Sequence, residues 1–79
     1  ENATASQTLV AVESILGAMK PEIAQVFRWR TTSDLSFKDI ATRQQVSLNT
    51  ALGRMHSAVK KIRAGLLEAG LLEGGTHAL

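Results

Sequence analysis

Cysteine is absent from this 79-residue chain, and histidine occurs only twice. The first absence excludes disulfide bonds and thiolate metal sites, and His56 and His77 are too few to hold a metal ion by themselves. No apolar run approaches the about 20 residues of a membrane-spanning helix, and no signal peptide is recognisable. We therefore expect a soluble, cytoplasmic module without a metal, a cofactor or a membrane partner.

The chain is long enough for one small domain with a compact core. That size leaves little room for a deep catalytic pocket. The sequence also contains no nucleophile with its base and orienter, no carboxylate pair and no glycine-rich phosphate loop. We predict that the chain is not an enzyme. Because the first residue is Glu1 and not Met, we expect the chain to be a piece of a longer protein.

The net charge of +2 conceals an uneven distribution. Residues 28–63 contain eight Lys and Arg against Asp34 and Asp39, whereas the rest of the chain has one Lys against five acidic residues. A segregated basic segment favours a polyanionic partner such as nucleic acid. Ordinary solubilising charge on an exposed face is the alternative, and charge alone does not separate the two.

The spacing of apolar residues predicts four helices and no strand, and therefore an all-α fold. The first helix should cover residues 7–19, after a small polar segment, 1–6, that we predict to be disordered or the end of a linker. Pro21 fits the first turn of a second helix that should run to about Arg30, followed by a loop over 31–34. The predicted centre of the core consists of Ile23, Val26, Phe27 and Trp29.

Two serines mark the starts of the third and fourth helices. Ser36 is a predicted N-cap, with Asp39 three residues later as a weak capping box, and this short helix should end near Gln44. Ser47 is the predicted N-cap of the long fourth helix. The turn between them has no glycine where a positive φ is expected. We predict that Gln45 adopts a positive φ at a cost of about 1–2 kcal/mol, or that the turn has another form.

The fourth helix is amphipathic when its residues are placed about 100° apart. We predict that its apolar face packs on the core; this face consists of Leu48, Leu52, Met55, Val59, Ile62 and Leu66. The predicted polar face consists of Thr50, Gly53, Arg54, Ser57, Lys60 and Lys61. The helix should fray through the near-repeat GLLEAGLLEGG, with stops at Gly70 and 74–75. The predicted domain is 7–73, and 74–79 should be a flexible tail.

A short helix, a tight turn and a longer two-faced helix are typical of a helix-turn-helix, here over residues 36–63. The candidate DNA-binding residues are Ser47, Asn49, Thr50, Gly53, Arg54, Ser57, Lys60 and Lys61. Arg54 is the strongest candidate for base reading, because an arginine about one and a half turns into this helix can reach a guanine edge. Lys60, Lys61 and Arg63 would contact phosphates. Each residue also has a structural alternative, as a helix-start residue, a weak point or a solvated charge.

The same residues resemble region 4 of the sigma-70 family of bacterial RNA polymerase sigma factors, especially the extracytoplasmic-function type. The identical positions are Leu35, Ser36, Ile40, Ala41, Ser47, Thr50, Arg54, His56, Ala58, Lys60, Lys61 and Arg63. Pro21 and the segment VFRWR at 26–30 are similar to the family's preceding helix. The chain departs from the pattern at residues 44–45, where the family has Leu-Gly, and at Ser57 and Val59, where it has arginines.

This resemblance implies a small four-helix domain without a wing, which recognises the minus-35 promoter element through its last helix. It also implies docking on the flap of the RNA polymerase β subunit, a monomeric state and an anti-sigma factor as a further partner. One alternative is a sigma-like protein-interaction module with weak DNA affinity, supported by Leu52, Ser57 and Val59 in place of cations. The other is a response-regulator type of helix-turn-helix, which dimerises through its last helix.

Overall fold

The computed structural model describes the backbone of residues 3–72 and the side chains of residues 6–72. Its four helices are α1 (Ala3–Ala18), α2 (Pro21–Thr32), α3 (Phe37–Gln44) and α4 (Leu48–Glu68). No strand occurs over these residues, which confirms the prediction of an all-helical fold. The predicted tail, 74–79, and the predicted stop at 74–75 lie outside the described residues. Within residues 3–72, no helix is both long and apolar enough to cross a bilayer.

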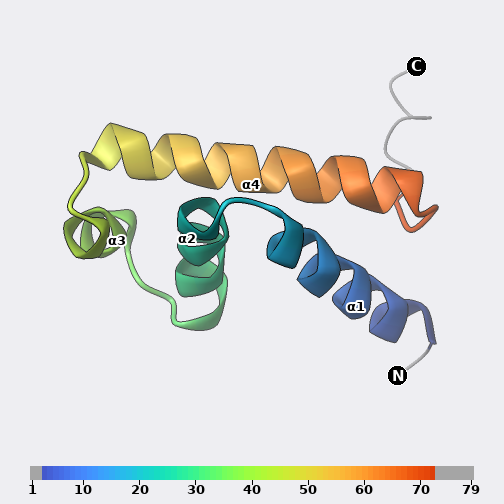
Figure 1. The fold of residues 1–79 in the computed structure, drawn as a ribbon. Coiled ribbons are helices and arrows are strands. Elements are labelled where there is room, and N and C mark those ends of the chain that lie inside the picture. Colours follow the sequence, from blue (N-terminus) through green and yellow to red (C-terminus); the bar gives the residue numbers. More distant parts are fainter. Residues whose placement is uncertain (1–2, 73–79) are drawn as a thin grey trace, which may run out of the picture.

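The long helix α4 organises the fold. All three shorter helices pack against it, and α2 also packs against α1 and α3. Figure 1 shows the three shorter helices along one side of α4, with α3 near its N-terminal end and α1 beside its C-terminal half. The opposite side of α4 has no helix packed on it within the described chain.

Two helix boundaries differ from the sequence prediction. Helix α1 begins at Ala3, inside the segment predicted to be disordered or a linker end, because that segment contains alanines and neither glycine nor proline to stop a helix. Helix α2 continues to Thr32, into the predicted loop 31–34. There the Thr31 hydroxyl donates a hydrogen bond of 2.8 Å to the Phe27 carbonyl, so its polar side chain is satisfied within the helix.

The predicted starts of α2, α3 and α4 are confirmed. Pro21 occupies the first turn of α2. The Ser36 hydroxyl accepts a hydrogen bond of 3.0 Å from the Asp39 backbone N–H at the start of α3. The Ser47 hydroxyl accepts one of 3.1 Å from the Thr50 backbone N–H at the start of α4. Each serine satisfies an N–H group that has no partner within its helix.

The turn between α3 and α4 confirms the prediction for Gln45, which has φ 59° and ψ 44°. Its N–H donates to the Thr42 carbonyl and the N–H of Val46 donates to the Ala41 carbonyl, in the pattern of a Schellman motif. Gly70, a predicted stop of the last helix, has φ 75° and lies two residues after the end of α4 at Glu68. A residue with a left-handed backbone conformation therefore follows both α3 and α4. After α4 it is a glycine, but after α3 it is Gln45, which has a side chain.

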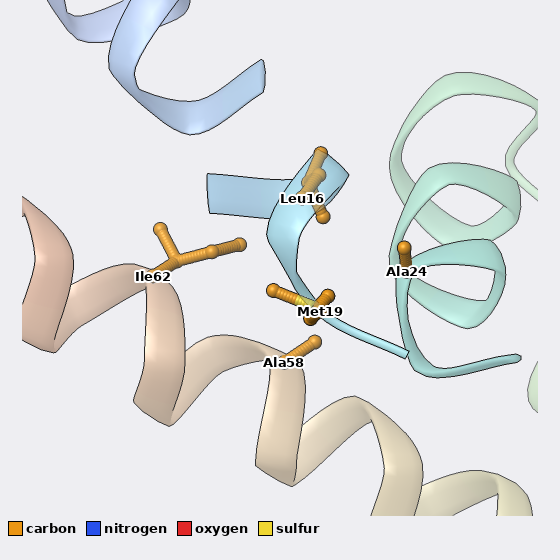
Figure 2. Close-up of a cluster of buried hydrophobic side chains, with 5 residues drawn as sticks. All are labelled: Leu16, Met19, Ala24, Ala58 and Ile62. Carbon is orange, nitrogen blue, oxygen red and sulfur yellow. The ribbon is translucent and has the colours of Figure 1, made fainter. Parts of the chain in front are cut away.

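The core consists of two clusters. The α1-side cluster lies between α1, α2 and α4, and consists of Leu16, Met19, Ala24, Ala58 and Ile62 (Figure 2). The turn-side cluster lies between α2, α3 and α4, and consists of Val26, Ile40, Ala41 and Ala51. Of the predicted core centre, Val26 is fully buried. Ile23 and Phe27 are partly buried against the α1-side cluster, and Trp29 is partly buried against the turn-side cluster.

The predicted packing face of α4 is wrong for three of its residues. Leu48, Leu52 and Val59 are 48%, 41% and 38% exposed, whereas Ile62 is buried as predicted. The helix is rotated by roughly 60° from the predicted orientation, so that Ala51, Ala58 and Gly65 face the other helices. These small residues, spaced seven apart, allow close approach. A Cβ atom added at Gly65 would lie 2.5 Å from the Cδ1 atom of Ile15.

Candidate nucleic-acid interface

The side of α4 that faces away from the other helices carries polar and basic residues. With about 100° between successive residues around the helix axis, the residues of this side lie within about 40° of one line that runs along α4. This outward strip consists of Asn49, Gly53, His56, Lys60 and Arg63, all of them exposed. Its side chains make no hydrogen bond or ion pair with the described part of the chain. At Gly53, an added Cβ would meet no atom within 4 Å. The strip is therefore free to meet a partner.

Arg54, predicted to read bases, lies on the inner side of α4 and is partly buried. Its Nη1 atom donates a hydrogen bond of 2.8 Å to Oε1 of Gln44, at the end of α3. The Nε2 atom of Gln44 donates in turn to the Glu22 carbonyl at 2.9 Å and to Oε1 of Gln25 at 3.1 Å. Arg54 thus joins α4 to α3, and through Gln44 to α2.

The other predicted residues divide into three groups. Asn49, Gly53 and Lys60 lie on the outward strip. Ser47 and Thr50 are exposed and form the cap of α4, with their hydroxyl oxygens 3.0 Å apart. Ser57 and Lys61 line a hollow between α1 and α4, with a volume of about 620 Å³ and walls that include Ile15, Met19 and Ile23. The structure does not bring the eight predicted residues together on one face.

Half of the eight basic residues in 28–63 have partners within the fold. Arg28 forms an ion pair with Glu13 on α1 at 3.0 Å. Arg30 forms an ion pair with Asp34 at 3.0 Å and lies 5.3 Å from the centre of the Phe37 ring. Arg43 lies 5.7 Å from the centre of the Trp29 ring, and Arg54 donates to Gln44. The other four basic residues of this segment have no such partner in the described chain; they are Lys38, Lys60, Lys61 and Arg63.

The sequence reasoning gave one residue of the outward strip, His56, no role in DNA binding, and it considered Arg63 only as a phosphate contact. The missing signal is the spacing of Ala51, Ala58 and Gly65, which fixes the inner side of α4. The largest apolar residues define a different side, because their bulk does not fit where the helices approach closely. Small residues seven apart would have placed His56 on the outer side.

An apolar ridge borders the outward strip on α4. It consists of Leu48, Leu52 and Val59, all exposed. The surface of α4 therefore combines a polar, cationic strip with an apolar flank. Within residues 3–72, no cluster of three or more acidic or histidine side chains could hold a metal ion. Comparison with protein-family models and with curated proteins finds no match.

Proposed function

We propose that this chain is a DNA-binding module of the kind found in region 4 of sigma factors. In this proposal, α3 and α4 form a helix-turn-helix, and α4 enters the major groove of DNA. The observation that carries the proposal is the outward strip, which is exposed, polar and cationic, while three helices support the opposite side of α4 (Figure 1). Such a supported helix with a bare polar face suits insertion into a groove.

The dimensions of α4 agree with groove binding. An α-helix with its side chains is about 10–12 Å across, which fits a major groove about 12 Å wide. Asn49 and Lys60 are eleven residues apart, so the strip extends about 16 Å along the helix. Gly53 lies between them, where its missing side chain lets the backbone approach base edges closely. The left-handed Gln45 closes a short turn of the length found in helix-turn-helix units.

In the sigma-factor setting, the module would recruit RNA polymerase to a promoter and would catalyse no reaction itself. Its DNA target would be the minus-35 element, and its protein contacts would be the flap of the polymerase β subunit and an anti-sigma factor. The module would act as a monomer in the cytoplasm. The resemblance over residues 19–63 supports these assignments.

Fluorescence anisotropy on labelled duplexes with varied minus-35-like sequences, across a salt series, tests DNA binding. We expect affinity that depends on sequence and falls as salt rises, because Lys60 and Arg63 are free to replace counterions. Lys60→Ala should lower the slope of log affinity against log salt by about 1. Lys20→Ala, which removes a cation away from the outward strip, is the matched control. Equal affinity for all duplexes would contradict the proposal.

The apolar ridge favours a second candidate function, a protein-interaction module with little DNA affinity. Three exposed aliphatic side chains on one helix are suited to packing against a partner helix or groove. In that case the chain would show no anisotropy change with DNA, but it would bind core RNA polymerase or an anti-sigma factor, and Leu52→Ser would weaken that binding. A stable dimer in sedimentation would instead favour the response-regulator type.

A further inference from the structure

We propose that Arg54 is a positioning residue that sets the angle between α3 and α4 through Gln44, and that Asn49 and His56 read base edges. The inference rests on the proposed DNA-binding function. It assigns a different role to each side of α4. The inner side holds the helix in place, and the outward strip makes the contacts that distinguish one DNA sequence from another.

The contacts of Arg54 carry the first step. Its guanidinium donates to Gln44 at 2.8 Å, and Gln44 donates to the Glu22 carbonyl at 2.9 Å. On a helix with about 100° per residue, Arg54 is about 140° around the axis from Asn49. To reach a base that Asn49 contacts, Arg54 would have to leave Gln44. That movement would remove the side-chain hydrogen bond between α4 and α3 and leave the Gln44 oxygen without its donor.

The outward strip carries the second step. Asn49 and His56 are seven residues apart, so they lie on the same side of α4 about 10 Å from each other. Both are exposed and have no hydrogen-bond partner in the described chain. An asparagine amide can pair with both the N6 and N7 groups of adenine. The imidazole of His56 can donate to a purine acceptor or accept from a base amino group.

Gly53 and Lys60 also belong to the outward strip. Gly53 lies between Asn49 and His56 with no atom near the position of a Cβ. The backbone of α4 can therefore come close to the groove floor at the point where the two reading side chains extend. Lys60, one turn beyond His56, is exposed and unpaired in the described chain, and is placed to contact a phosphate.

The test begins with selection of duplexes from a pool with a randomised ten-base-pair centre, using the 79-residue chain. Affinity is then measured on the selected duplex and on all its single-base-pair variants. We expect Asn49→Ala and His56→Ala each to lose roughly 5- to 150-fold on the selected duplex and to lose discrimination at one or two base pairs. Lys60→Ala should weaken binding to every duplex by the same factor.

Arg54→Ala and Gln44→Ala should behave alike. Each should lower affinity by the same factor on every duplex and leave base preference unchanged. The double variant should lose no more than either single variant, because both remove one shared link. Binding is measured well below each variant's melting temperature. If Arg54→Ala does not fold, Arg54→Met, which keeps the apolar stem of the side chain, replaces it.

Three results would overturn the inference. Loss of discrimination at one base pair in Arg54→Ala, but not in Gln44→Ala, would make Arg54 a base-reading residue. Unchanged affinity of folded Arg54→Ala would make its role purely structural. Full base preference in both Asn49→Ala and His56→Ala would remove them from the readout. Failure of the wild-type chain to select any sequence would instead overturn the proposed function, and the inference with it.

Discussion

At the N-terminal end of α4, the turn-side cluster contains three side chains with no exposed surface, Val26, Ile40 and Ala51, whereas the α1-side cluster at the other end contains one, Ala58. The polar contacts that hold α4 are also concentrated at its turn end. The turn end has the cap of α4 at Ser47, the left-handed Gln45, and the link from Arg54 through Gln44 to α2.

The α1 end depends more on apolar contact. The ion pair between α1 and α2, Glu13 with Arg28, is exposed, and an open hollow is lined by residues of α1 and α4. The comparison teaches that the geometry of α4 is specified most strictly at the end that would read DNA. Because fewer of its core side chains are fully buried and its ion pair is exposed, we expect the α1 end to open before the turn end.

The largest effect should come from Ile40→Ala in the turn-side cluster. Ile40 is fully buried, so its truncation should lower the free energy of unfolding by about 2–5 kcal/mol. Urea denaturation followed by circular dichroism measures this loss. Val59→Ala, at an exposed aliphatic position on α4, is the control and should change stability little. A loss below that of the control would show that the turn end is not the better packed one.

The next largest effect should come from Gly65→Leu at the α1 end. A Cβ here would come within 2.9 Å of two side-chain carbons of Ile15, so a leucine must push aside the Ile15 side chain or the whole of α1. We expect a loss of about 1–3 kcal/mol. The control is Gly53→Leu, because that position is open and leucine favours helix. Hydrogen exchange should locate the loss in α1, and faster exchange in α3 instead would contradict the separation of the two ends.

Gln45→Gly should have a smaller effect of the opposite sign. A left-handed residue with a side chain is strained, and glycine removes that strain. We expect a gain of about 1 kcal/mol, seen as a rise in melting temperature of roughly 4–8 °C for a domain of this size. Lys60→Gly, at an exposed position inside α4, should lose about 1 kcal/mol. A fall in the melting temperature of Gln45→Gly would mean that its side chain supports the turn.

The smallest effect should come from the ion pair between Glu13 and Arg28. Their side chains are 63% and 44% exposed, so water and salt screen the attraction. A double-mutant cycle with Glu13→Ala and Arg28→Ala should give a coupling free energy below about 1 kcal/mol. A repeat at high salt should reduce it further. A larger, salt-insensitive coupling would show that this contact holds α1 as firmly as the polar link of Gln44 and Arg54 holds α3.

The features that sequence predicted well are local. A cap such as Ser36 or Ser47 depends on residues within one turn, and the positive φ of Gln45 follows from the need for a tight turn without glycine. The packing face of α4 was predicted wrongly, because the signal for it is the spacing of its small residues and not of its largest apolar ones. It depends on how closely α1 and α2 approach Ala58 and Gly65, and the bulk of Leu52 and Val59 suggested the wrong side.

The predictions for the candidate site also divide into those that depend on local pattern and those that depend on long-range contacts. Sequence reasoning selected Asn49, Gly53 and Lys60, which the structure places on the outward strip, and their contact with DNA stays a prediction. The position of Arg54 depends on Gln44, whose own partner Glu22 lies 22 residues earlier in the chain. The spacing of residues within one helix cannot reveal such contacts between helices. Long-range contacts therefore decide which cations are available to a ligand.

The bare outer side of α4 also bears on how this scaffold can diversify. Asn49, Gly53, His56 and Lys60 contact no other helix through a hydrogen bond or ion pair, so exchanging them leaves both core clusters intact. Under the proposed function, one or two substitutions here would change the target preference without a compensating change in the interior. A library randomised at these four positions should consist mostly of folded proteins. The fold can in that sense carry many different outer surfaces on α4.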